Sequence, residues 1–181
     1  MSGVTRTVAN IPDAIVLKRD RDLEGRKWHI WVRRGLFTLL PVVTALALAN
    51  VFGQRPATET VNGNGASLEL HAPNRVRGGL LFQARFNITA EQDVQNAVLL
   101  LDPGWLEGMT LNTLEPSPEK ETSDNGRLRF ELGPIAAGDS FLLFAQFQTN
   151  PTNVGHRSQA VELYDNDRKL LELDRSITIF P

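Results

Sequence analysis

The most constraining feature of this sequence is a charge-free segment, Gly35 to Gly53, which reads GLFTLLPVVTALALANVFG. As an α-helix, these 19 residues would rise about 28 Å, at about 1.5 Å per residue. That length is close to the hydrocarbon thickness of a bilayer, roughly 30 Å. The segment therefore predicts one transmembrane helix over residues 35–53, which separates an N-terminal tail (1–34) from a longer C-terminal part.

The charges on the two sides of this segment differ in sign. Residues 1–34 carry eight Lys and Arg against four acids, a sum of +4, whereas residues 54–181 carry eleven against seventeen, a sum of -6. Basic residues near the end of a membrane span favour the cytoplasmic side. We therefore expect a single-pass protein of the cell membrane with a cytoplasmic N-terminus and an extracytoplasmic C-terminal domain.

A second interpretation of the apolar segment stays open at this point. Ala47-Leu48-Ala49 fits the small-residue pattern of a signal cleavage site, and Arg33-Arg34 resembles the basic pair of a twin-arginine signal. The apolar run continues beyond this triplet to Phe52, which favours a retained signal anchor. The alternative is cleavage after Ala49, which would release the C-terminal part from the membrane.

Aromatic and basic residues gather just before the apolar segment. Trp side chains favour the headgroup region, and basic side chains favour anionic lipid. The sequence therefore predicts a membrane collar on the cytoplasmic side, with local helix packing as the alternative and no binding of nucleic acid. The collar residues are Arg26, Lys27, Trp28, Trp31, Arg33 and Arg34.

Pro41 lies inside the apolar segment. Proline removes one helical hydrogen bond and often kinks a helix, although membrane helices tolerate it. We expect either a simple kink or a packing notch that receives the helix of another integral membrane protein.

The rest of the chain has the pattern of an all-β domain. Residues 54–65 (QRPATETVNGNG) are polar and rich in Gly, Asn and Thr, which predicts a flexible linker. From Ala66 onward, apolar and polar residues alternate in short runs with turn residues between them, as in SLEL, LFQARFNI and GRLRFEL. Residues 66–181 are therefore predicted to form one antiparallel, Ig-like β-sandwich.

Three segments carry a resemblance to a known group of domains. They are Ala72-Pro73 with Gly78-Gly79, the turn Asp102-Pro103-Gly104-Trp105, and residues 133–139 (GPIAAGD) before the run SFLLFAQFQ. With these segments, residues 66–181 resemble the Ig-like modules of bacterial surface proteins, including CARDB-like and DUF11-like domains. The resemblance implies a fold and a bacterial source, and it brings no catalytic residues with it.

The sequence offers little material for catalysis or metal binding. It contains no cysteine, and its three histidines, His29, His71 and His156, are far apart. Asp165-Asn166-Asp167 lacks the glycine and the spacing of a calcium loop and instead predicts a hairpin turn. We therefore expect no catalytic residues, no metal and no cofactor, and a protein that is not an enzyme.

Trp105, Leu106 and Met109 are the most notable apolar residues of a loop. They predict either a contact patch for a partner or a cap on the end of the sandwich, with Trp105 as its main residue. The function hypothesis is a non-catalytic accessory subunit that lies in the lipid bilayer and binds another integral membrane or envelope protein. The alternative is an extracytoplasmic glycan-binding module.

Overall fold

The computed structural model describes residues 27–51 and 53–181. The chain divides into two compact units, residues 1–46 and residues 47–181, which are described separately. Most of the first unit's described residues belong to one helix, α1 (Lys27–Leu48), and the second unit is built from strands.

Helix α1 is long and apolar enough to cross a membrane from Trp28 to Leu48, and a signal sequence would have the same properties. It corrects the predicted bounds of 35–53. The helix starts eight residues earlier, at Lys27, and ends at Leu48 because Asn50 turns the backbone to a positive φ of 53°. Arg33 and Arg34 therefore lie inside the helix, immediately before its charge-free part.

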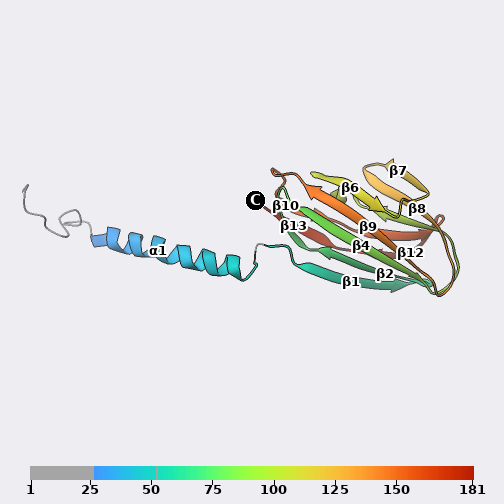
Figure 1. Ribbon diagram of the computed structural model, residues 1–181, viewed down its shortest axis with the longest axis horizontal. Helices are drawn as coiled ribbons and strands as arrows, with labels where there is room; N and C mark the ends of the chain where they lie inside the picture. The colour runs from blue at the N-terminus through green and yellow to red at the C-terminus, as the bar shows by residue number, and fades with distance from the viewer. Residues whose placement is uncertain (1–26, 52) are drawn as a thin grey trace, which may run out of the picture. The chain divides into compact units, whose positions relative to one another are not determined.

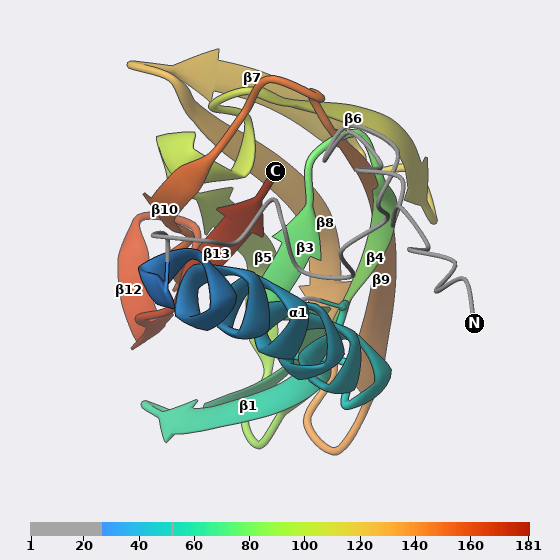
Figure 2. The same ribbon diagram turned by 90° about the vertical axis from the view of Figure 1, so that its left-hand side faces the viewer.

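Residues 47–181 form a β-sandwich of two five-stranded sheets with a smaller sheet at one end, as Figures 1 and 2 show. Sheet A has the order β1 (Pro56–Gly63), β2 (Ala66–Pro73), β4 (Leu81–Ala90), β9 (Ser140–Thr149), β6 (Met109–Glu115). Sheet C has the order β12 (Arg168–Leu173), β11 (Val161–Asp165), β5 (Val94–Leu101), β8 (Arg127–Ile135), β7 (Lys120–Asp124). Sheet B has the order β10 (Gly155–Ser158), β13 (Ser176–Phe180), β3 (Arg75–Arg77).

The strand pairs of sheets A and C are all antiparallel, and β13 with β3 is a parallel pair. The structure confirms the inward-facing residues that the period-2 pattern of the sequence predicts. Phe82, Ala84, Phe86 and Ile88 on β4 are all buried, as the alternation predicts. Leu128, Phe130 and Leu132 on β8 supply the same kind of face from the opposite sheet.

The predicted flexible linker is wrong over most of its length, because residues 56–63 form strand β1 at the edge of sheet A. β1 pairs with β2 through a two-residue turn in which Asn64 has a φ of 41° and Gly65 a φ of 86°. Asn-Gly is the residue pair that such a hairpin turn favours. The domain therefore begins near residue 54 rather than at residue 66.

Three further short strands have no clear signal in the sequence, namely β3, β7 and β10. Each is five residues or shorter, too short to show an alternation. The predicted hairpin at Asp165-Asn166-Asp167 is confirmed: Asp165 pairs with Arg168 across a two-residue turn.

Trp105 lies at the centre of the core and is completely buried. It ends the short 3-10 helix η2 (Pro103–Trp105), and its ring packs against Phe86 and Phe147 at centroid distances of 5.6 and 5.2 Å. Its indole Nε1 donates hydrogen bonds to the carbonyl oxygens of Gln159 and Ala160 at 3.1 and 3.3 Å. The contact-patch prediction is therefore wrong for Trp105, and its role as a core residue is supported.

The close approach of η2 to the chain before β11 explains the glycine beside this tryptophan. A Cβ atom on Gly104 would lie 1.7 Å from the carbonyl oxygen of Ser158. Only a residue without a side chain fits there, so Gly104 lets the indole enter the core.

Replacing Trp105 with Ala should lower the free energy of unfolding by about 3 kcal/mol or more, because it removes a large buried ring and two hydrogen bonds. Urea unfolding of the full chain in mild detergent measures this change. Trp31→Ala is the matched control, since Trp31 is 71% exposed on α1 and should leave domain stability unchanged. Equal stability of the two variants would contradict the core role of Trp105.

Candidate interaction groove

The two large sheets are joined along one side and open along the other. On the closed side, β1 and β12 pack against each other. On the other side, β6 is the edge of sheet A and β7 is the edge of sheet C, and among the described strands β6 pairs with β9 alone and β7 with β8 alone. Figure 1 shows β6 and β7 on the same side of the domain.

A groove of about 590 Å³ lies at this open side. Leu106, Met109, Leu111, Leu114 and Leu128 supply its apolar part, and all five contact or belong to the core cluster. The polar lining residues are Thr110, Asn112, Thr113 and Glu121. The groove therefore combines a leucine floor with polar walls.

Strand β6 is irregular at the point where it borders the groove. Its register with β9 shifts between Leu111 and Thr113, so Asn112 forms a β-bulge. Bulges on edge strands limit unwanted pairing with other sheets and redirect side chains. In β6 the bulge separates two half-buried leucines, Leu111 and Leu114, that both reach the groove.

Glutamates lie on or next to both edge strands, and one of them is a lining residue of the groove. Glu121 lines it, Glu115 ends β6, and Glu119 directly precedes β7. Within the described residues, the side chains of these three glutamates take part in no ion pair. The neighbouring Lys120 instead pairs with Glu131 at 3.5 Å. Glu121 thus adds to the apolar groove one negative charge that no ion pair among the described residues compensates.

The predicted interface residues separate in the structure. Leu106 and Met109 line the groove, whereas Trp105 lies beneath it in the core. Pro41 lies within α1, and its role as a packing notch stays a prediction. The sequence missed Leu111, Leu114 and Glu121 as groove residues, because membership of an edge depends on strand order rather than on local pattern.

Of the predicted collar residues, Arg26 lies outside the described residues and Lys27 begins α1. Trp28 and Trp31 are 63% and 71% exposed. The guanidinium carbons of Arg34 and Arg33 lie 5.5 and 5.6 Å from the ring centroids of Trp31 and Phe37. These contacts place aromatic and basic groups side by side on the helix surface, and the membrane collar stays a prediction.

A network of ion pairs covers the outer face of sheet C. Glu162 on β11 receives hydrogen bonds from Lys169 at 2.9 Å and from Tyr164 at 2.8 Å, and pairs with Arg127 at 3.0 Å. Arg127 also pairs with Asp102 at 2.9 Å. Burial by itself raises the pKa of Glu162, but the Lys169 and Tyr164 hydrogen bonds and the two positive charges together hold this pKa below its usual value. The network ties β8, β11 and β12 together.

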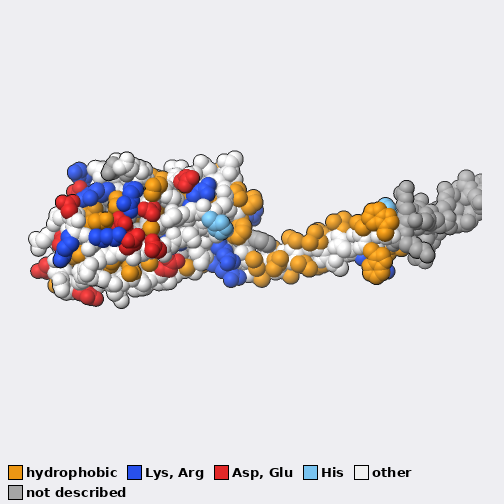
Figure 3. Space-filling model, turned by 180° about the vertical axis from the view of Figure 1, so that it is seen from behind, with side chains coloured by type: hydrophobic (Ala, Val, Ile, Leu, Met, Phe, Trp, Pro, Cys, Tyr) orange, Lys and Arg blue, Asp and Glu red, His pale blue; other side chains and the backbone are white. Residues whose placement is uncertain are grey.

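No group of three or more metal-ligating side chains is found in the part of the chain that the structure describes. Figure 3 shows mixed acidic and basic side chains over the body of the domain.

No family model and no curated protein matches the chain. Three solved structures show a distant similarity to the chain. One is AvmM, which catalyzes macrocyclization in alchivemycin A biosynthesis. It is 8% identical to this chain with a TM-score of 0.44, and the match covers 71% of this chain and 90% of AvmM. A FixG-related protein from Vibrio parahaemolyticus is 11% identical with a TM-score of 0.37, covering 64% of this chain and 96% of that protein.

The third is a GH20 exo-β-N-acetylglucosaminidase from Vibrio harveyi, 11% identical with a TM-score of 0.32, covering 70% of this chain and 18% of the enzyme. Likenesses at this level transfer no activity to this chain. The resemblance to CARDB-like and DUF11-like modules stays a prediction.

Replacing Glu162 with Gln should lower stability by about 2 kcal/mol at pH 7, because it removes hydrogen bonds from charged and neutral donors to a buried carboxylate. A carboxylate whose pKa is lowered by folding stabilises the folded state at pH values above the pKa of the unfolded chain. This stabilisation is lost as the pH falls through the pKa of the folded state. The difference from the unmodified chain should therefore shrink below about pH 4.5, the ordinary value of Glu162. Urea unfolding between pH 7 and pH 3 measures it.

The exposed Glu91, which has no ion pair among the described residues, supplies the matched control Glu91→Gln. A Glu162→Gln difference that stayed constant with pH would show that the carboxylate charge does not stabilise the network.

Proposed function

We propose that this protein is a non-catalytic interaction subunit that is held at the membrane by α1 and binds a segment of an integral membrane or envelope protein in the β6–β7 groove. The observation that carries the proposal is the open side of the sandwich, where the half-buried leucines Leu111 and Leu114 line one groove with Glu121. The orientation, with the N-terminus in the cytoplasm, rests on the +4 tail and the -6 domain.

The chemistry of the groove defines its occupant. An extended segment fits a long opening between two edge strands, and an apolar side chain of such a segment fits between Leu111 and Leu114. A flanking Lys or Arg residue would face Glu121. The proposed partner segment is therefore extended and apolar at its centre, with a basic residue at one end.

The glycan-binding alternative loses its strongest candidate residue. Sugar rings stack on exposed aromatic faces, and the indole of Trp105 is completely buried. The hydroxyl of Tyr164 is engaged by Glu162. These observations favour the protein-binding proposal over a lectin.

The membrane tether is tested by extracting membranes that contain the full chain with alkaline carbonate and measuring its mass. A retained anchor should leave an intact 20.1 kDa chain in the membrane pellet. A soluble product that lacks residues 1–49 would establish cleavage after Ala49 and remove the tether from the proposal.

The groove is tested with a double variant, Thr113→Arg and Glu121→Arg, which changes exposed lining residues without removing the leucine floor. A photo-crosslinking residue at Thr110 should form an adduct with a membrane partner, and the double variant should reduce that adduct about tenfold, because positive charge repels a basic segment.

Glu91→Arg repeats the charge change at an exposed site away from the groove and should leave the adduct unchanged. Equal adduct yields from both variants would contradict groove binding. So would an equal adduct from a crosslinker on the outer face of sheet C.

A further inference from the structure

Several strands meet at the end of the domain where the chain enters β1. The parallel pairing of β3 and β13 places Phe180 opposite Arg77, and the N–H of Gly78 donates to the Phe180 carbonyl oxygen at 2.7 Å. The turn after β3 leads directly into β4 at Leu81. Gln54 Nε2 donates to the Leu81 carbonyl oxygen at 2.8 Å, which fixes the segment before β1 at this end.

The segments that build this end hold few acidic residues, and the exposed Glu107 beside the Val154 loop is paired with Arg157 at 3.5 Å. No Asp or Glu occurs at residues 50–58, 70–90, 140–161 or 175–181. Arg55, Arg75 and Arg77 are exposed there, although residues 54–181 as a whole sum to -6. Basic side chains therefore outnumber acidic ones at the end where the chain enters, in contrast to the domain as a whole.

Exposed apolar side chains gather at the same end. Leu80, Leu81 and Val154 are 45%, 47% and 48% exposed. The loop that carries Val154 packs over the β3–β4 turn, since a Cβ on Gly78 would meet the Pro151 carbonyl oxygen at 2.9 Å. We call Arg55, Arg75, Arg77, Leu80, Leu81 and Val154 the basic end.

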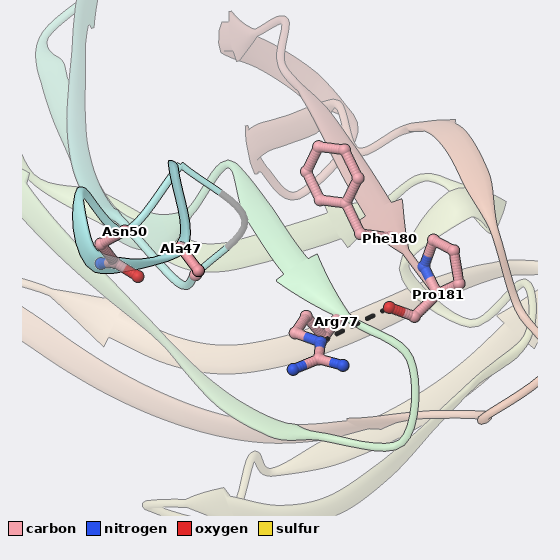
Figure 4. A pocket seen from close by; sticks show the side chains of 6 residues that line it. Ala47, Asn50, Arg77, Phe180 and Pro181 are labelled. Carbon is pink, nitrogen blue, oxygen red and sulfur yellow. Dashed lines mark hydrogen bonds between the residues drawn. The ribbon is translucent and has the colours of Figure 1, made fainter. Parts of the chain in front are cut away.

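A cavity of about 480 Å³ opens beside these residues, and Figure 4 shows it from close by. Arg77 lines it and donates from Nε to the Pro181 carbonyl oxygen at 3.4 Å, while Ala47, Asn50 and Phe180 supply other parts of its wall. A guanidinium beside a partly apolar cavity is a suitable arrangement for an anionic headgroup.

We propose that the basic end rests on a surface of anionic phospholipid. The inference rests on the proposed membrane tether. Leu48 ends α1 and Gln54 is already fixed to the domain, and the six intervening chain steps reach about 20 Å at most. The tether therefore keeps the basic end within a short distance of the bilayer that α1 enters.

The charges of the basic end favour anionic phospholipid as the surface that it contacts. Arginine side chains close to an anionic leaflet are attracted within about a Debye length, and leucines enter the boundary between headgroups and acyl chains. The acidic remainder of the domain is repelled by the same surface. Attraction at one end and repulsion elsewhere orient the domain, and the residues of the basic end are separate from those that line the β6–β7 groove.

The test uses the full chain reconstituted in vesicles. Because the sequence contains no cysteine, Leu80→Cys gives a single attachment point for an environment-sensitive dye, and Glu91→Cys at the far end of β4 gives the control. Vesicles contain phosphatidylcholine alone or phosphatidylcholine with phosphatidylglycerol, plus a headgroup spin label that quenches the dye on contact.

We expect the dye at position 80 to be quenched about twofold or more strongly in anionic vesicles than in neutral ones, and the dye at position 91 to be unquenched in both. Arg55→Gln with Arg75→Gln should abolish the increase. The matched pair Arg129→Gln with Arg168→Gln, on sheet C, should preserve it.

The proposal would be overturned if the dye at position 80 were quenched no more than the dye at position 91. It would also be overturned if quenching at position 80 did not depend on anionic lipid. In native membranes, the dye at position 80 could be shielded from both the lipid quencher and soluble iodide. That result would assign Leu80 and Leu81 to a protein contact and would also overturn the proposal. Carbonate extraction of the same vesicles reports the tether separately, so failure of α1 to anchor the chain is distinguishable from failure of the basic end to bind lipid.

Discussion

The β-sandwich depends on the contact between Trp105 and Arg175 at the centre of its core. The guanidinium carbon of Arg175 lies 5.4 Å from the indole centroid, and its side chain is 1% exposed. Burial lowers the pKa of this arginine, while the Glu59 carboxylate, 3.6 Å from Nε, acts in the opposite direction. A buried cation is costly unless it is paired, so its partners must be held in place.

Those partners come from strands far apart in the sequence. Arg175 donates from Nη2 to the Pro73 carbonyl oxygen at the end of β2 and faces Glu59 on β1, while Trp105 connects η2 to the chain before β11. One buried cluster therefore ties sheet A to the strands of the opposite layer. It also explains why β1 belongs to the domain: the carboxylate of Glu59 balances a charge that would otherwise be isolated in the core.

Closure at β1 and β12 has a consequence for the opposite side of the sandwich. With both sheets joined along one side, the edges β6 and β7 remain apart, and Leu111 and Leu114 stay only half buried. Glu121 in the same groove suits a basic residue, and the arginines at the basic end suit anionic lipid. The proposed protein and lipid contacts thus use different residues of one small domain.

The sequence alone determined the elements whose signals are local. Period-2 alternation identified β4 and β8 with the correct inward faces, Asp165-Asn166-Asp167 marked a hairpin, and the charge-free segment predicted an apolar helix near its observed position. β1 was missed although Asn64-Gly65 carries a strong hairpin signal, because its threonines and Glu59 leave no apolar alternation.

Only the tertiary structure decided where Trp105 points, which strands form open edges, and how arginines from two separate segments, Arg55 and strand β3, share one end. Each of these depends on strand order and on contacts between distant residues, which local sequence patterns do not specify.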